Sequence, residues 1–299
     1  MKFTRSNFFP LKKIFDLNQL KNFHKDHILF NSYSNNFEIN DISSLTYFRS
    51  NSLLFLDSDL DILDIKDKNI HVVSNIEKNK DYYKNIFIIK NFNLSYNLIC
   101  NELFYHEDQI DFKDDFNIIN GSYISKYSNI HKSAVIGKNN IITRGVEIGK
   151  NSIIKNNVVI KNSIIGDNVV ICDNSSIGTS GFGFDFNNRG SLNLNPQLGV
   201  TILDDNVHVG ASCTIDRGKI DHTYIGKNTM IDNMVHIAHN VIIGNNGCIA
   251  AQTGISGSVK IGENVTIGGQ VGFAGHLTIG KNVIIAAKSG VTKNIKDNS

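Results

Sequence analysis

Bulky apolar residues recur at six-residue steps from about residue 124 to the end of the chain. The first run is broken by one five-residue step, and a later run keeps the six-residue step without a break. These positions are Ile124, Ile130, Ile136, Ile142, Ile148, Ile154, Ile160, Ile165, Ile171 and Ile177, then Ile225, Ile231, Ile237, Ile243, Ile249, Ile255, Ile261, Ile267, Phe273, Ile279, Ile285 and Val291. This period fits neither the 3.6-residue repeat of a helix nor the alternation of a single strand.

A six-residue period is long enough for one short strand and one turn. Three such sides close a coil of about 18 residues, and coils stack at the strand spacing of roughly 4.8 Å. The apolar ladder then points inward, while Gly, Asn and Asp occupy the corners, where a positive φ is often needed. The repeat therefore predicts a parallel β-helix over residues 120–295. It does not determine the hand of the helix, and the general rule for parallel connections favours a right-handed one.

Residues 1–115 have a different texture and predict a mixed α/β domain. The spacing predicts helices over 11–23 and 93–104, the second opened by an Asn cap. Short β-rich runs bounded by polar residues predict strands over 69–75 and 84–91. The acidic, polar stretch 107–117 is the expected linker to the β-helix.

Composition narrows the class of protein. The chain has 299 residues and a formal net charge of +2, with basic and acidic residues interspersed, so neither nucleic acid nor an acidic partner is indicated. The four cysteines are far apart and contain no CxxC pair, which favours small buried thiols in a reducing compartment. No apolar run has the length of a membrane span or a signal peptide, so we expect a soluble cytoplasmic protein without integral membrane contact.

Residues 178–201 interrupt the six-residue rhythm with "GFGFDFNNRGSLNLNPQLG". This stretch is too long for a corner turn and carries three phenylalanines. A long ordered loop on a rigid scaffold is usually functional, although a packed surface flap is the alternative.

Three stretches carry a specific resemblance: "GTSGFGFDFNNRG" (178–190), "IDRGKIDHTYIG" (215–226) and "IDNMVHIAHNVIIGNN" (231–246). Together with the repeat, they resemble the UDP-3-O-acylglucosamine N-acyltransferases, hexapeptide-repeat enzymes of lipid A and lipopolysaccharide biosynthesis. The resemblance covers most of residues 120–290 and implies a left-handed β-helix, an exception to the general rule. It also implies a homotrimer that transfers a (3R)-3-hydroxyacyl group from acyl carrier protein to the 2-amine of UDP-3-O-acylglucosamine. No cofactor is expected, because the phosphopantetheine arm of the carrier holds the acyl donor.

His239 is the candidate base, although a solenoid histidine is more often surface cover or a corner residue. In a straight prism, residues 239, 257 and 275 occupy one column, with His276 beside the last and roughly 10 Å from His239. Gly257 and Gly275 leave a groove along that edge. Imidazole titrates near neutrality and suits removal of a proton from an attacking amine. The resemblance makes His239 the general base. It implies that His276 stabilises negative charge on the intermediate or on the phosphopantetheine arm of the carrier.

The Gly257 N–H is a reasonable oxyanion donor, because glycine permits close approach. Asp232 either orients His239 or serves as a turn carboxylate. We expect Cys248 to fill the core, so direct transfer is favoured over an acyl-enzyme. Asn233 and Asn240, in the same motif as His239, are assigned to substrate binding.

In the family, the long loop borders the cleft between neighbouring subunits, which would place Phe182 and Phe184 along the acyl or pantetheine path. The N-terminal domain of the family binds uridine through a segment that "LLFLDS" (53–58) matches at Phe55. Ser58 and Asp61 stand where Asn and Tyr are expected, and "NFNLSY" (91–96) loosely matches a second family stretch. Phe55 therefore either stacks on uracil or belongs to the core.

Alternatives remain open. The HxxH pair His236 and His239, with His208, His222 or His276, would suit zinc, because γ-class carbonic anhydrases use the same prism with histidines from adjoining subunits. A related nucleotide-sugar O- or N-acyltransferase, or a non-catalytic scaffold, is also compatible with the repeat. Family members commonly continue into a C-terminal helical segment, whereas this chain stops in "AAKSGVTKNIKDNS". We therefore expect either that the acyl carrier docks on exposed Lys and Arg near the end of the prism or that the enzyme works with a reduced docking surface.

Overall fold

The structure is a computed structural model that describes residues 4–33, 36–44, 49, 51–56, 71–81, 83, 85–105, 114–186 and 192–299. It divides into two compact units. The solenoid unit comprises Met1–Phe8, Asp111–Phe182 and Gln197–Ser299, and the N-terminal unit comprises Phe9–Ile110 and Gly183–Pro196. The expected linker lies mostly outside the described residues, and Ser58 and Asp61 lie wholly outside them.

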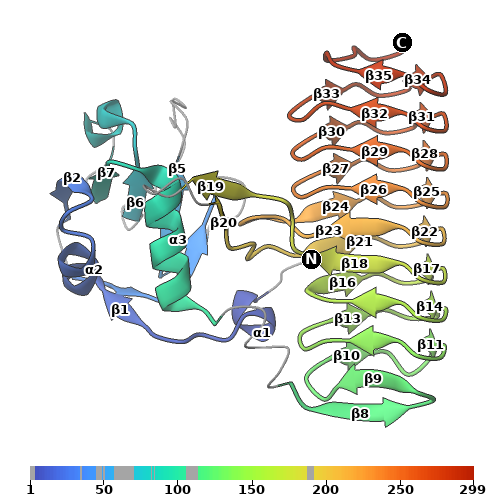
Figure 1. The fold of residues 1–299 in the computed structure, drawn as a ribbon, viewed down its shortest axis with the longest axis horizontal. Coiled ribbons are helices and arrows are strands. Elements are labelled where there is room, and N and C mark those ends of the chain that lie inside the picture. The colour runs from blue at the N-terminus through green and yellow to red at the C-terminus, as the bar shows by residue number, and fades with distance from the viewer. Residues whose placement is uncertain are drawn as a thin grey trace. The chain divides into compact units, whose positions relative to one another are not determined.

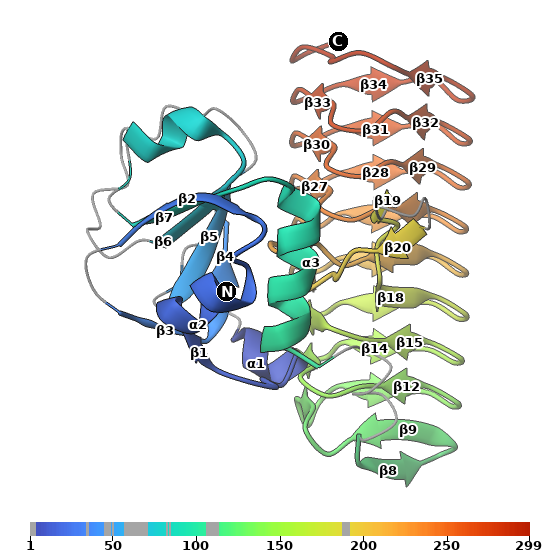
Figure 2. The same cartoon turned by 60° about the vertical axis from the view of Figure 1, so that its left-hand side comes forward.

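The solenoid stacks short strands into three sheets, one on each side of its coils (Figures 1 and 2). The first sheet contains β10 (Asn129–Ile130), β13 (Glu147–Ile148), β16 (Ser163–Ile165), β21 (Thr201–Leu203), β24 (Thr223–Ile225), β27 (Ile242–Ile243), β30 (Lys260–Ile261) and β33 (Thr278–Ile279). The second contains β11 (Val135–Ile136), β14 (Ile153–Ile154), β17 (Val170–Ile171), β22 (His208–Val209), β25 (Met230–Ile231), β28 (Cys248–Ile249), β31 (Thr266–Ile267) and β34 (Ile284–Ile285).

The third sheet begins with β8 (Phe116–Ile119), which pairs antiparallel with β9 and closes the first coil. The other pairs in this sheet are parallel: β9 (Ser122–Ser125), β12 (Ile141–Ile142), β15 (Val159–Ile160), β18 (Ser176–Thr179), β23 (Thr214–Asp216), β26 (His236–Ile237), β29 (Gly254–Ile255), β32 (Gly272–Phe273) and β35 (Gly290–Val291). The parallel β-helix predicted from the six-residue period is confirmed.

The periodic apolar residues form the core of the solenoid. Every one of them from Ile142 onward is buried in a single hydrophobic cluster, and the three in the first coil, Ile124, Ile130 and Ile136, pack against it while partly buried. Valines from the turns add a second layer, as Val235 and Val259 show. Continuous burial of β-branched side chains is the main stabilising term of this unit.

One corner of the coils carries a ladder of asparagines. Asn228, Asn246 and Asn264 have φ values of 58°, 58° and 57°, in the left-handed region that Asn tolerates better than most residues. Each side-chain amide donates to the Asn one coil further on, at 3.1 Å from Asn228 to Asn246 and 3.0 Å from Asn246 to Asn264. The many asparagines thus serve as turn residues and also link successive coils.

The N-terminal unit has a five-stranded sheet in the order β2–β7–β6–β5–β4. Its elements are β1 (Phe15–Asp16), α2 (Leu17–Phe23), β2 (Ile28–Ser32), β3 (Glu38–Ile39), β4 (Asp41–Ser43), β5 (Ser52–Leu56), β6 (His71–Ser74), η1 (Glu77–Asp81), β7 (Ile86–Ile89), α3 (Phe92–Leu103) and the hairpin β19 (Phe184–Phe186) and β20 (Leu192–Leu194). The short helix α1 (Arg5–Phe8) belongs to the solenoid unit.

The predicted α/β class of this unit is confirmed. Asn91 caps α3 by accepting from the Leu94 N–H at 3.0 Å, as expected. The predicted helix over 11–23 is shorter, because Phe15 and Asp16 pair with β3 and Asp16 then caps α2 in a capping box with Gln19.

Two of the four cysteines differ from expectation. Cys100 and Cys213 are buried, but Cys172 is only partly buried and Cys248 is exposed. Cys248 does not fill the core, because it occupies the outward position of β28 while Ile249 points inward. Within the described part of the chain, no helix is long and apolar enough to cross a bilayer.

Candidate active-site groove

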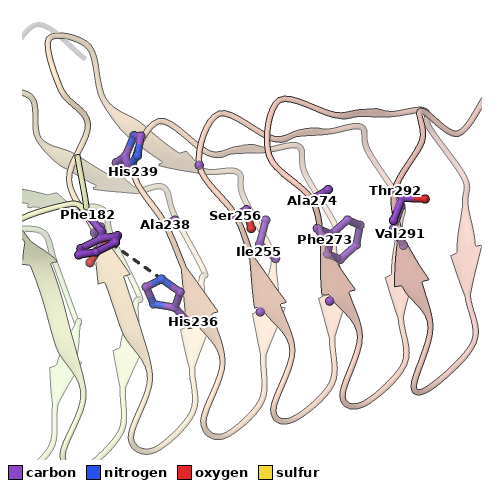
Figure 3. A pocket seen from close by; sticks show the side chains of 14 residues that line it. Phe182, His236, Ala238, His239, Ile255, Ser256, Phe273, Ala274, Val291 and Thr292 are labelled. Atoms are coloured by element: carbon purple, nitrogen blue, oxygen red, sulfur yellow. Dashed lines mark ion pairs between the residues drawn. The ribbon is translucent and has the colours of Figure 1, made fainter. Parts of the chain in front are cut away.

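A groove of about 560 Å³ runs along the outer surface of the third sheet in the solenoid unit (Figure 3). Its floor is bare backbone, because the outward positions of β29 and β32 are Gly254 and Gly272, and beside the lining residues Val291 and Thr292 the outward position of β35 is Gly290. A methyl group at any of these three glycines would meet no atom within 4 Å. Three successive coils thus leave an open, side-chain-free track roughly 10 Å long between the first and last of these glycines.

His239 lies at one end of this track, two residues past β26. A methyl group at Gly257, one coil further on, would stand 2.8 Å from both Cε1 and Nε2 of the imidazole. A methyl group at Gly181, on the other side, would stand 2.6 Å from the His239 Cβ. Glycine at these two positions therefore lets the backbone close around the ring and hold it in a narrow slot.

The hydrogen bonds around Asn240 determine which nitrogen of His239 carries the proton. The Asn240 Oδ1 accepts from the Lys219 backbone N–H at 3.0 Å, which fixes the oxygen end of that amide. The same oxygen lies 3.2 Å from Nδ1 of His239. Because Oδ1 is only an acceptor, Nδ1 must be the donor, and the neutral ring then has its lone pair on Nε2. Nε2 is also the nitrogen beside Gly257.

The stretch "IDRG" builds the wall of the groove beside this ring. Ile215 points into the core, and Asp216 lines the groove. Arg217 is buried and donates from Nε to the Gln197 carbonyl at 2.7 Å and from a terminal nitrogen to the Gly178 carbonyl at 3.0 Å. It thereby joins the two ends of the loop that interrupts the repeat.

The last residue of that stretch, Gly218, gives room to the Asp221 backbone and to Asn240, the partner of His239. A methyl group there would stand 2.4 Å from the Asp221 carbonyl oxygen and 3.0 Å from the Asn240 Nδ2. The buried Arg5 links one end of this loop to the stretch 215–226, because it donates to the carbonyls of Leu198 and, at 3.2 Å, of Ile220. The four residues of "IDRG" thus have different roles: Ile215 packs in the core, Asp216 lines the groove, Arg217 holds the loop ends and Gly218 leaves room for its neighbours.

Asp216 and His236 form a second polar pair in the groove. One oxygen of Asp216 accepts from the Thr179 hydroxyl at 2.8 Å, and the other lies 3.9 Å from Nε2 of His236 (Figure 3, dashed line). Nδ1 of His236 is hydrogen-bonded to the Thr214 hydroxyl oxygen, at a distance of 2.7 Å. Burial raises the pKa of the Asp216 carboxyl, while the Thr179 hydroxyl and the positive charges of His236, His239 and Arg217 partly offset that rise.

The structure brings some predicted site residues together and leaves others apart. His239, Gly257 and Phe182 line the groove. His276 follows Gly275 at an exposed corner with a φ of 61°, donates its backbone N–H to the Gly257 carbonyl, and is not among the residues that line the groove. Asn240 acts through His239, as described above.

Asn233 and Asp232 serve the turn before β26. The Asn233 side chain accepts from the Ala211 N–H at 2.7 Å, and the Asp232 carboxylate accepts from the Asn233 N–H at 2.7 Å. Neither residue is among those lining the groove. Asp232 is therefore the turn carboxylate rather than the group that orients His239.

Two predicted substrate-binding aromatic residues lie in the N-terminal unit. Phe184 is on β19 and is 42% exposed. Phe55 is only 5% exposed and packs edge-on against Phe92 and Tyr96. A ring that stacks on uracil needs an open face, so the uracil assignment of Phe55 is not supported and the core alternative fits the structure.

Sequence reasoning missed Asp216 and the glycine track. The track had a visible signal, because Gly precedes the inward residue in three coils that are 18 residues apart. Asp216 had no such signal, since the loop 178–201 separates it from its partner Thr179. Among the described residues, no three His, Cys, Asp or Glu side chains are grouped to hold a metal ion.

Residues 222–257 and 258–293 match the family model of the bacterial transferase hexapeptide, six repeats each. Residues 222–293 of the solenoid therefore carry the bacterial transferase hexapeptide repeat. A 66-residue segment is 52% identical to a UDP-3-O-acylglucosamine N-acyltransferase of Caulobacter vibrioides, which confirms the resemblance found in the motifs. That segment is 22% of this chain and only 19% of the relative.

Solved structures extend the likeness of the hexapeptide solenoid. The Francisella novicida UDP-N-acetylglucosamine acyltransferase superimposes with a TM-score of 0.54 at 27% identity, over 60% of this chain and 63% of that one. A structure from Acinetobacter baumannii gives a TM-score of 0.51 at 24% identity over 60% and 68%, which supports the fold alone. The chain therefore covers less than two thirds of the first of these structures.

Proposed function

We propose that this chain transfers a (3R)-3-hydroxyacyl group from acyl carrier protein to the 2-amine of UDP-3-O-acylglucosamine, giving UDP-2,3-diacylglucosamine for lipid A. The observation that carries this proposal is the His239 Nε2 lone pair at the end of a groove with a glycine floor. A base beside a long, open track suits a small nucleophile and an extended acyl chain. The named relative supports the choice of acceptor.

The reaction needs one base and one oxyanion donor. The amine nitrogen attacks the thioester carbonyl, and Nε2 of His239 takes a proton from that nitrogen. The Gly257 N–H stabilises the oxyanion of the tetrahedral intermediate, a contribution typically worth about 3 kcal/mol. Collapse forms the C–N bond and breaks the C–S bond, and the proton passes from His239 to the leaving thiolate. No covalent enzyme intermediate is required.

The acyl donor occupies the glycine track in this scheme. Its acyl chain lies over Gly254, Gly272 and Gly290. The phosphopantetheine arm of the carrier supplies the thioester, so the scheme uses no further cofactor. Exposed Lys293 and Lys296 follow the far end of the track, with exposed Lys288 just before it, and they give an acidic carrier protein a basic docking surface. Replacing Lys293 and Lys296 with Glu should raise KM for the carrier, while the same change at Lys150 and Lys155 in the first coils should not.

Self-association completes the proposal. Outward positions of the first coils expose Tyr123 and Ile141 on the third sheet and Val135 and Ile153 on the second, with exposed fractions of 40–57%. Burying these apolar side chains between copies of the chain favours a homotrimer. Sedimentation equilibrium of the purified protein, compared with an Ile141→Asp/Ile153→Asp variant, tests this assembly.

A second candidate function transfers the acyl group to a sugar hydroxyl. The likeness to the Francisella novicida UDP-N-acetylglucosamine acyltransferase favours it. A non-catalytic scaffold is the third alternative, and it predicts that loss of His239 has no effect.

A single-turnover assay separates these functions. The purified protein is mixed with a panel of 3-hydroxyacyl carriers and either UDP-3-O-acylglucosamine or UDP-N-acetylglucosamine. We expect turnover with the amine, and a loss of at least about a hundredfold in His239→Asn. His131→Asn, a change at a partly buried histidine of the first coils, is the matched control. Turnover with the hydroxyl acceptor alone would favour the second candidate, and full activity of His239→Asn would exclude the base assignment.

A further inference from the structure

Asp216 is a buried carboxylate that lines the same groove as the proposed base. Only 7% of the residue is exposed, and it lines the groove together with His236 and His239. When His239 carries a proton, its charge lowers the pKa of the Asp216 carboxyl. A carboxylate in such a place loses hydration that the protein must replace.

The protein replaces that hydration at only one of the two oxygens. Oδ1 accepts from the Thr179 hydroxyl at 2.8 Å. Oδ2 lies 3.9 Å from Nε2 of His236, which is beyond hydrogen-bonding distance. Arg217 follows directly but directs two of its nitrogens to the carbonyls of Gln197 and Gly178. Oδ2 is thus a hydrogen-bond acceptor that the groove presents to a ligand.

The groove therefore offers two acceptors to the reacting group: Oδ2 of Asp216 and Nε2 of His239. A primary amine brings two hydrogens and one lone pair. It can donate one hydrogen to each acceptor while its lone pair faces the acyl carbon. A hydroxyl has one hydrogen, so it must leave one of the two acceptors without a donor, and an unpaired buried carboxylate oxygen is unfavourable.

Resting on the function proposed above, we infer that Asp216 recognises the acceptor nitrogen and makes the site selective for amines over hydroxyls. His239 removes the proton, and Asp216 holds the second N–H so that the lone pair is aimed at the thioester. A site that is built to bond a substrate N–H rejects an analogue without it far more strongly than an apolar pocket rejects a missing methylene.

The test compares two acceptors that differ in one group, UDP-3-O-acylglucosamine and UDP-3-O-acylglucose, on the wild type and on Asp216→Asn. Asn has the shape of Asp but places an N–H donor where one oxygen stood. We expect kcat/KM for the amine to fall about thirtyfold, as for loss of a charge-assisted hydrogen bond. The inhibition constant of the hydroxyl analogue should stay within about threefold of the wild-type value or become tighter, because Asn can donate to the hydroxyl oxygen.

Asp204→Asn is the matched control, because Asp204 is bound to the Tyr224 hydroxyl on the first sheet, outside the groove. It should leave both constants unchanged. Equal weakening of both ligands in Asp216→Asn would show a purely structural role and overturn the inference, as would an unchanged kcat/KM for the amine. Failure of the wild type to acylate the amine is a different result, because it would overturn the proposed function itself.

Discussion

The His239 ring lies so close to the Gly257 backbone, one coil further on, that a methyl group at Gly257 would stand 2.8 Å from Nε2. The base and the proposed oxyanion donor thus come from neighbouring coils of one rigid stack. Their spacing is determined by the distance between strands rather than by a flexible loop, which suits groups that must be held in place during the reaction.

Gly257→Ala should displace the imidazole and lower kcat about a hundredfold, since misplacement of a catalytic group by 1 Å has effects of that size. The fold should survive, because the nearest atoms to the new methyl group belong to the His239 side chain. Steady-state kinetics and a melting curve measure the two effects. Gly269→Ala is the control, because its methyl group would meet only the Ala251 carbonyl oxygen at 3.4 Å. Wild-type kcat in Gly257→Ala would contradict the arrangement of the site.

Gly290→Leu should shorten the acyl chains that the protein accepts. The side chain would enter open space at the far end of the glycine track, so it should leave the fold intact while obstructing the groove. We expect kcat/KM for the longest accepted donor to fall about tenfold or more, with little change for the shortest. A donor panel measures this, with Thr266→Leu on the second sheet as control. A uniform loss over all chain lengths would place the acyl chain elsewhere.

Asn246→Ala should destabilise the solenoid by about 1–2 kcal/mol, because Ala lacks the amide of the ladder and disfavours a φ of 58°. Asn246→Gly should recover most of the backbone contribution but none of the ladder. Chemical denaturation of the three proteins separates the two terms. Equal stability of the Ala and Gly variants would mean that the backbone conformation contributes nothing.

The N-terminal unit should lose stability in mild acid through His24. Burial and the nearby charge of His27 lower the pKa of His24 from 6.5 to about 4. His24 is therefore protonated near pH 6.5 in the unfolded chain but only near pH 4 in the folded unit. The contribution of neutral His24 to the free energy of unfolding is therefore fully present above pH 6.5. It is lost as the pH falls toward 4, by at most about 3 kcal/mol.

Hydrogen exchange of β6 and β7, corrected for intrinsic rates, measures this loss separately from the solenoid. His24→Leu should flatten the pH dependence, whereas His131→Leu, in the solenoid, should leave it as in the wild type. A dependence of the same size in His24→Leu would assign the acid lability to another group.

The N-terminal unit shows how far local sequence signals reach. Asn91 was readable as a cap, and the strands at 71–74 and 86–89 lie within the predicted runs. Phe55 was ambiguous, because an aromatic residue in an apolar strand reads alike whether it is buried or binds a base. Its contacts with Phe92 and Tyr96 on α3 decide the matter, and they join residues about 40 positions apart.

The sequence alone determined the solenoid, because each six-residue step independently specifies which residue points inward, and 19 such steps agree. It also placed His239 at a corner. Only the tertiary structure decided what surrounds that imidazole. A regular coil places residues 18 positions apart side by side. Thr179 instead contacts Asp216, 37 positions further along the chain, and Thr214 pairs with His236, 22 positions further along. The pairing between these coils depends on how the chain accommodates the residues inserted between them. The outward side chains show no periodic pattern from which that pairing could be predicted.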